Sequence, residues 1–173
     1  LLEDCVGMEV ANRQRSAVSM RELVESDEFK QSRASLPVAI GREVTGAVKV
    51  FDLADSPHLL VAGATGQGKS VGLNVLVASL LYSKRPSELK LIFIDPKKTV
   101  LRSLCQEMDD RYGLLEKAGT PEIKEYNAKY VNHQLNPKNG HRFLPYLVGI
   151  IDEYSQLVLG MGGPEGKAHA KSI

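Results

Sequence analysis

The sequence predicts an α/β protein with a mostly parallel sheet and helices on both of its faces. One observation behind this class is that continuous apolar runs, typical of strands buried on both faces, alternate with helical patterns along the chain. A second is that a glycine-rich loop follows the first of these runs and opens a helix. Strand–helix–strand order of this kind implies right-handed crossovers between parallel strands.

A small α/β region is expected to precede this core. Residues 1–35 are the most polar stretch and are interpreted as a lead-in or linker segment, with residues 36–173 as the main domain. A helix is predicted over Ser19–Phe29, since Ser19 is a suitable N-cap and an acidic residue follows three positions later. The apolar runs 36–41 and 47–51 flank a polar turn that ends in glycine and predict a β-hairpin.

The first half of the alternating core begins at His58–Ala62, an apolar run predicted to be a buried strand. A helix from about Lys69 to Tyr82 and a second buried strand over Leu89–Ile94 are expected to follow. The next helix, Lys98–Lys117, has apolar residues at steps of three and four, which predict one apolar stripe. That stripe contains Leu101, Leu104, Cys105, Met108, Tyr112 and Leu115.

The second half of the core contains one more helix and one more strand. Gly119 is expected to end the preceding helix. Thr120 and Pro121 have the order N-cap and first-turn proline, so a third helix is predicted to start there. Tyr146–Ile151 is predicted to be a third buried strand.

Length and composition fit one globular domain. The chain has 173 residues, of which 43% are hydrophobic and 25% are charged, and this balance fits neither a disordered chain nor a disulfide scaffold. The longest apolar run, around Leu76–Leu81, falls far short of the ~20 residues that span a bilayer. The first residues lack the basic and apolar regions of a signal peptide. We therefore expect a cytoplasmic location without membrane contact by this part of the protein.

Charge and cysteine content exclude two simple interpretations. With 22 basic and 21 acidic residues the net charge is +1, so the global basic excess typical of nucleic-acid binders is absent. Binding of DNA or RNA would need a local patch or an assembly. Cys5 and Cys105 form no CxxC pair and have no nearby histidine, which argues against a zinc site and indicates a reducing compartment. Cys105 is expected to be a buried, inert thiol.

The strongest functional signal is a match to the phosphate-binding pattern GxxxxGK[ST]. Its glycines allow backbone N–H groups to surround an anion, and the following helix adds its N-terminal dipole. Lys69 can reach the β- and γ-phosphates, and the Ser70 hydroxyl can ligate Mg²⁺. A glycine-rich turn that matches by chance is disfavoured, because the motif follows an apolar run and opens a helix. The predicted nucleotide-binding residues are Gly63, Ala64, Thr65, Gly66, Gln67, Gly68, Lys69, Ser70 and Val71.

A second signal is the pair of carboxylates, Asp152 and Glu153, that directly follows the third apolar run. Open α/β sheets place ligand groups at such strand ends, where Asp152 could hold Mg²⁺ through its water shell. Glu153 could polarise a water for in-line attack on the γ-phosphate. An acidic strand end that only caps a helix is the alternative, and the phosphate-binding pattern upstream makes it less favoured. The adjacent pair is typical of ATPases and favours hydrolysis over transfer to a second substrate.

Asp95 and Lys97 follow the Leu89–Ile94 strand and form a weaker candidate site. They could face the nucleotide or couple it to a moving element. A charged turn after a strand explains them equally well. None of the four histidines has a ligand or triad spacing, so none is assigned chemistry.

Several motifs together resemble the motor domain of FtsK/SpoIIIE DNA translocases, over nearly the whole chain up to about residue 157. They include LPVAIG at 36–41, PHLLVAG at 57–63, the phosphate-binding loop through Asn74 and LIFIDPK at 91–97. EMDDRY at 107–112, EYN at 125–127 and LPY at 144–146 are similar to further landmarks of this family.

The resemblance implies a RecA-like ATPase that uses ATP and Mg²⁺, assembles as a hexameric ring and pumps double-stranded DNA in chromosome segregation and cell division. In this family pattern Lys69 and Glu153 are catalytic, while Ser70 and Asp152 serve Mg²⁺. The anchoring membrane region of such proteins is expected outside this chain. A related secretion or conjugation ATPase, or a nucleotide-dependent switch, is the alternative function.

The chain departs from the family pattern in two places. The stretch between Lys97 and the EMDDRY motif is shorter, so a segment is deleted there or omitted from the sequence, and we favour omission. After Glu153 the family has an aromatic residue, a small residue and an acid, whereas this chain has Tyr154, Ser155 and Gln156. The aromatic character is kept and the acid is not.

Overall fold

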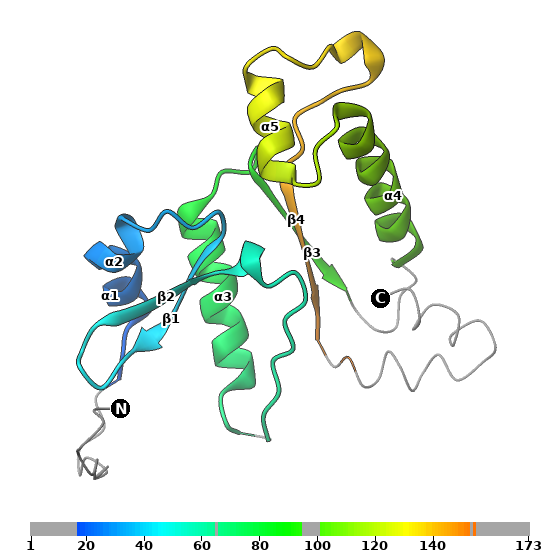
Figure 1. The fold of residues 1–173 in the computed structure, drawn as a ribbon. Coiled ribbons are helices and arrows are strands. Elements are labelled where there is room, and N and C mark those ends of the chain that lie inside the picture. The colour runs from blue at the N-terminus through cyan, green and yellow to red at the C-terminus, as the bar shows by residue number, and fades with distance from the viewer. Residues whose placement is uncertain (1–16, 65, 95–100, 153, 155–173) are drawn as a thin grey trace, which may run out of the picture. The chain divides into compact units, whose positions relative to one another are not determined.

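The structure, a computed structural model, describes residues 17–64, 66–94, 101–152 and 154 (Figure 1). By their internal contacts the residues group into two compact units, Leu1–Lys84 and Arg85–Ile173, and each unit is described by itself. The sequence-based division into a segment 1–35 and a domain 36–173 stays a prediction.

The first unit contains a β-hairpin packed against helices (Figure 1). Its two strands are antiparallel, with a register shift between Ala39 and Gly41, so the predicted hairpin is confirmed. The predicted helix after the glycine-rich loop is also confirmed. The hydrophobic core of the first unit contains Leu23, Val24, Phe29, Ala39 and Val48. The elements are α1 (Met20–Glu25), α2 (Asp27–Lys30), β1 (Pro37–Arg42), β2 (Val48–Asp52), a short 3₁₀ helix (Leu53–Asp55) and α3 (Lys69–Ser83).

The single helix predicted over residues 19–29 is wrong, because the structure divides it at Ser26. Ser19 does cap α1, since its Oγ accepts a hydrogen bond from the Glu22 N–H at 3.2 Å. Ser26 is extended, with ψ 153°, and its Oγ donates to the Leu23 carbonyl while accepting from the Phe29 N–H. A serine that caps both neighbours offers the backbone an alternative to a continuous helix.

The buried strand predicted over residues 58–62 is also wrong. These residues form no strand, and Leu59, Leu60 and Val61 are exposed, with Leu60 at 79%. A strand buried on both faces needs hydrogen-bonding neighbours and covering layers. Within the described part of the first unit, the only sheet is the β1–β2 hairpin, and residues 58–62 do not pair with either of its strands. The apolar composition of residues 58–62 makes the segment suitable for burial, but it does not supply the neighbouring elements that would bury it.

The second unit contains a parallel pair of strands beside helices (Figure 1). The strands β3 (Leu89–Ile94) and β4 (Tyr146–Ile151) pair along their whole lengths, from Leu89 opposite Tyr146 to Ile94 opposite Ile151. Both predicted strands and their parallel direction are thus confirmed. The larger RecA-like sheet with helices on both faces is not shown by the described residues. The helices are α4 (Leu101–Ala118), α5 (Ile123–Val131) and a short 3₁₀ helix (Pro137–Asn139).

The helix α4 packs on the strand pair through only part of its predicted apolar stripe. Leu104 lies against Ile94, and its Cδ2 is 3.6 Å from where a Cβ on Gly149 would be. Met108 and Tyr112, however, are exposed by 43% and 62%. Cys105 is half-buried rather than buried, so the expectation of a fully enclosed thiol is wrong. The two-stranded sheet is too narrow to cover the whole stripe.

The third helix begins later than predicted because Thr120 belongs to the end of α4. Gly119 is left-handed, with φ +62°, and its N–H bonds the Glu116 carbonyl while the Thr120 N–H bonds the Leu115 carbonyl. This pair of hydrogen bonds is a Schellman motif, which closes a helix and removes Thr120 from the N-cap role. The N-cap of α5 is Glu122.

Candidate functional site

The glycine-rich loop lies in the first unit, directly before α3. Gly66 and Gly68 have φ of +81° and +88°, which side chains other than glycine rarely adopt. The Gln67 N–H closes a turn onto the Ala64 carbonyl at 3.1 Å. A Cβ placed on Gly66 or Gly68 would meet nothing within 4 Å, so glycine is required there by backbone conformation rather than by crowding. Thr65 lies outside the described residues.

The loop leads into an uncapped helix N-terminus. Gly68 is the N-cap of α3 and supplies no side-chain hydrogen bond, and the first helical bond joins the Gly72 N–H to the Gly68 carbonyl at 2.8 Å. The first turn contains no acidic residue that would oppose an anion. The N–H groups at the start of a helix have no partner in the helix itself and carry its positive dipole end. This end of α3 is therefore suited to a phosphate.

The predicted side chains around this loop are accessible to a ligand. Lys69 and Ser70 are the first two residues of α3, where Lys69 is half-buried and Ser70 is exposed. The remaining described members of the predicted stretch are also exposed, namely Gly63, Ala64, Gly66, Gln67, Gly68 and Val71.

The predicted carboxylate site lies in the second unit, where β3 and β4 end side by side. Because Ile94 pairs with Ile151, the carboxyl ends of both strands share one edge, and the exposed Asp152 follows directly. This edge is where parallel sheets collect ligand groups. Glu153, Asp95 and Lys97 lie outside the described residues. Since the glycine loop and Asp152 belong to different units, their convergence on one ligand stays a prediction from the sequence.

No group of three or more His, Cys, Asp or Glu side chains that could hold a metal occurs among the residues that the structure describes.

Sequence reasoning treated the motifs at 107–112, 125–127 and 144–146 only as family landmarks, and the structure joins them. Side chains of α4 and α5 bind the backbone that leads into β4. Arg111 donates from Nη1 to the Pro145 carbonyl at 2.6 Å, and Asn127 bonds both backbone polar groups of Leu144. No local sequence signal could have found these contacts, because Arg111 lies 34 positions and Asn127 lies 17 positions before its partner along the chain.

Glu107 connects two arginines, Arg111 of α4 and Arg142 of the segment that leads into β4. It accepts hydrogen bonds from Arg111 Nε at 2.8 Å and from Arg142 Nη2 at 3.3 Å. The hydrogen bond from Arg111 holds the pKa of Glu107 below its usual value; partial burial opposes this effect, and the charges of Arg111 and Arg142 add to it. Glu107 is therefore ionised at neutral pH and fixes the Arg111 guanidinium.

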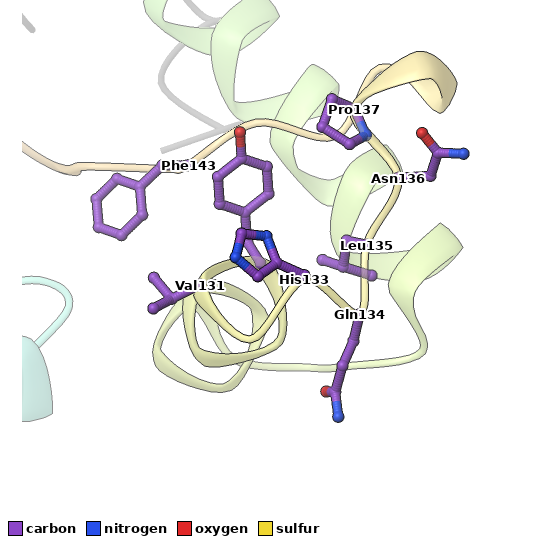
Figure 2. Close-up of a pocket in the computed structure, with 8 residues that line it drawn as sticks. Val131, His133, Gln134, Leu135, Asn136, Pro137 and Phe143 are labelled. Atoms are coloured by element: carbon purple, nitrogen blue, oxygen red, sulfur yellow. The ribbon is translucent and has the colours of Figure 1, made fainter.

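A hollow of about 600 Å³ lies elsewhere in the second unit, around the carboxyl end of α5 (Figure 2). Figure 2 shows side chains from one continuous stretch and Phe143 around it. It contains none of the residues that the sequence predicts to bind nucleotide or metal. Its lining is Tyr130, Val131, His133, Gln134, Leu135, Asn136, Pro137 and Phe143.

No helix in the described ranges is long and apolar enough to cross a membrane.

The described residues form a mixed α/β structure in which a glycine-rich loop with two left-handed glycines opens α3. The sequence model of the FtsK/SpoIIIE family matches residues 19–103. With the relatives described next, this match confirms the resemblance of the chain to the FtsK/SpoIIIE family.

Curated relatives resemble nearly all of this chain. The "DNA translocase FtsK" of Borreliella burgdorferi is 41% identical over 180 residues, which cover 90% of this chain and 22% of that protein. The "DNA translocase FtsK" of Treponema pallidum is 40% identical, with 91% and 22% covered. The "DNA translocase SftA" of Bacillus subtilis is 35% identical, with 91% and 18% covered. The chain thus spans about a fifth of the length of these relatives.

The matched regions of the relatives are longer than the part of this chain that they match. In the first match, 180 aligned positions correspond to 90% of a chain of 173 residues. That relative therefore has residues inside the matched region without a counterpart here.

Proposed function

We propose that this chain is the ATP-hydrolysing part of a motor that moves double-stranded DNA in chromosome segregation and cell division. The observation that carries the proposal is the glycine loop, with left-handed Gly66 and Gly68 opening an uncapped helix, in a chain that resembles the FtsK/SpoIIIE family. The relatives named as DNA translocases support the choice of DNA over another moved polymer.

In the proposed site, residues Gly63–Val71 bind the phosphates of ATP through backbone N–H groups and the Lys69 ammonium. The Ser70 hydroxyl and the Asp152 carboxylate would hold Mg²⁺, which offsets negative charge on the phosphates when it is bound. Glu153 orients a water molecule for in-line attack and accepts its proton. Asp95 and Lys97, which follow β3, are candidates for coupling hydrolysis to movement.

The proposed assembly is a homo-oligomeric ring, hexameric by the family pattern, around the DNA duplex. Nucleotide sites between subunits of such rings are commonly completed by an arginine from a neighbour, which stabilises the transition state. We propose a RecA-like core for residues 36–173 and a cytoplasmic location for it, with residues 1–35 as the lead-in segment.

The test is the rate of ATP hydrolysis by the complete motor with and without long linear duplex DNA, at several salt concentrations. We expect stimulation by DNA that falls steeply with salt, because phosphate contacts release counterions. The Glu153→Gln variant is the control for contaminating ATPases and should show no turnover. Hydrolysis that DNA does not stimulate would overturn the proposal in favour of a secretion or conjugation ATPase. Absence of hydrolysis would favour a nucleotide-dependent switch.

A further inference from the structure

The segment that leads into β4 is held by side chains rather than by a strand or helix. We call this segment, residues 141–145, the β4 approach. Within it, the Asn127 Nδ2 donates to the Leu144 carbonyl at 2.7 Å, and the Leu144 N–H donates to Asn127 Oδ1 at 2.9 Å. Leu144 is only 1% exposed, so water cannot replace these two bonds. One amide side chain thus satisfies both backbone groups of one buried residue.

A second attachment comes from α4. The Arg111 side chain is 13% exposed, and its guanidinium donates to the Pro145 carbonyl as well as to Glu107. Proline has no N–H, so its carbonyl is the backbone group by which residue 145 can be held. The planar fork of arginine can donate in two directions at once, whereas a lysine cannot reproduce this geometry.

A third attachment is a buried pair of rings. The Tyr126 hydroxyl lies 3.0 Å from Nδ1 of His141, and the Arg142 N–H donates to the same hydroxyl at 3.4 Å. Tyr126 is 0% exposed and His141 is 8% exposed. Since the hydroxyl accepts from Arg142, it is best placed to donate to His141 Nδ1, which makes that nitrogen the acceptor. The β4 approach is therefore attached from its first residue to its last.

β4 needs such an attachment because its own sequence specifies register weakly. Register is strongly set when apolar and polar residues alternate, since a slip by one residue then exposes the apolar face. Five of the six residues Tyr146–Ile151 are apolar or aromatic and Gly149 is the other, so both faces would remain apolar after a slip. A parallel pair also lacks the tight hairpin that sets register between antiparallel strands. A slip by one residue would turn Asp152 to the opposite face.

We propose that Asn127 and Arg111 are positioning residues that hold β4 in register with β3 and thereby place Asp152 at the carboxyl edge of the strand pair. Neither residue needs to touch the nucleotide, because each acts through the backbone of the β4 approach. The inference rests on the proposed function, since it assigns Asp152 to a Mg²⁺–nucleotide site.

The experiment measures the affinity of the full chain for ATP by calorimetry, in excess Mg²⁺ and in EDTA. For the unaltered chain we expect tighter binding in Mg²⁺. We call the ratio of the ATP affinity in Mg²⁺ to that in EDTA the gain from Mg²⁺. In Asn127→Ala the affinity in EDTA should be unchanged, because the glycine loop lies in the other unit. The gain from Mg²⁺ should fall by about tenfold or more, as is typical when the support of a metal ligand is lost. Arg111→Lys should change binding in the same direction.

Two control variants separate positioning from general destabilisation. Asn132→Ala removes an exposed asparagine whose side chain makes no hydrogen bond within the described part of the chain, and it should keep the full gain from Mg²⁺. Leu115→Ala removes half-buried apolar contact from α4 without altering the side chains that hold the β4 approach. It should lower stability and yet keep the gain, provided that the chain is folded at the temperature of the titration.

A full gain from Mg²⁺ in both Asn127→Ala and Arg111→Lys would overturn the inference. An equal loss in Leu115→Ala would also overturn it, because the effect would then be one of stability alone. Should Asn127→Ala fail to fold, Arg111→Lys decides the question by the same measurement. An unaltered chain that binds ATP with no gain from Mg²⁺ would instead overturn the metal role of Asp152 in the proposed function, and the inference with it.

Discussion

Replacing Ser79 by alanine should destabilise the first unit, because this buried side chain joins α3 to β1. The Ser79 Oγ accepts a hydrogen bond from the Ala39 N–H at 3.2 Å and donates to the Val75 carbonyl at 2.8 Å, and both Ser79 and Ala39 are 0% exposed. In Ser79→Ala the Ala39 N–H becomes a buried donor without a partner, which costs about 1–3 kcal/mol. The higher helix propensity of alanine offsets about 0.5 kcal/mol of this cost.

The expected net effect is a loss of about 0.5–2.5 kcal/mol in the free energy of unfolding of the first unit. Urea unfolding followed by circular dichroism measures it. Ser83→Ala is the matched control, because Ser83 lies on the same helix and its Oγ donates only to the Leu80 carbonyl. That control should change stability by less than about 0.5 kcal/mol. Equal stability of Ser79→Ala and the unaltered chain would refute the assignment of Ser79 as the link between α3 and β1.

Three further predictions follow from the loop, the acid pair and the Glu107 group. Gly68→Ala should weaken ATP binding, measured by calorimetry. It should also lower the free energy of unfolding, measured in urea, by about 1–2 kcal/mol through strain at φ +88°. Unchanged ATP binding would contradict a role of the left-handed loop in binding. Glu153→Gln should bind ATP normally and stop turnover, measured by phosphate release, and normal hydrolysis would exclude Glu153 as the base.

The third concerns pH: because folding lowers the pKa of Glu107 below 4.5, its contribution to stability is present above that value and is lost as pH falls through the lowered pKa. Between about pH 6 and about pH 3 the free energy of unfolding of the second unit should fall less in Glu107→Gln than in the unaltered chain. An identical fall in both would contradict the role of Glu107 in stability.

The sequence predicted the elements whose signals are local. The helix α3, the strands β3 and β4 and the β1–β2 hairpin are confirmed, because apolar runs and turn residues within each segment determine them. The glycine-rich loop was also predictable from the sequence, and the structure gives its physical reason: the backbone at positions 66 and 68 is left-handed, which favours glycine. The family was recognisable from several motifs together, although no single one of them would have sufficed.

The wrong predictions concern segments whose structure depends on contacts with other parts of the chain. Residues 58–62 are apolar enough for a buried strand, but a strand also needs an edge to join, which the sequence of the segment cannot reveal. Ser26 fills two capping roles, one at the end of α1 and one at the start of α2, so it divides the helix that the sequence predicted. Thr120 was compatible with two roles, and its hydrogen bond to the Leu115 carbonyl places it at the end of α4. The attachment of the β4 approach was missed because it joins residues from α4, α5 and the loop that are distant in sequence.

The most direct test of the central claim, that residues Gly63–Val71 form a nucleotide-phosphate site, is equilibrium binding of ATP with Mg²⁺ to the full chain and to Lys69→Ala. Lys84→Ala, a half-buried lysine at the other end of α3, is the matched control. We predict saturable binding by the unaltered chain and by the control, and none detectable in Lys69→Ala. Binding of equal strength by all three would contradict the account.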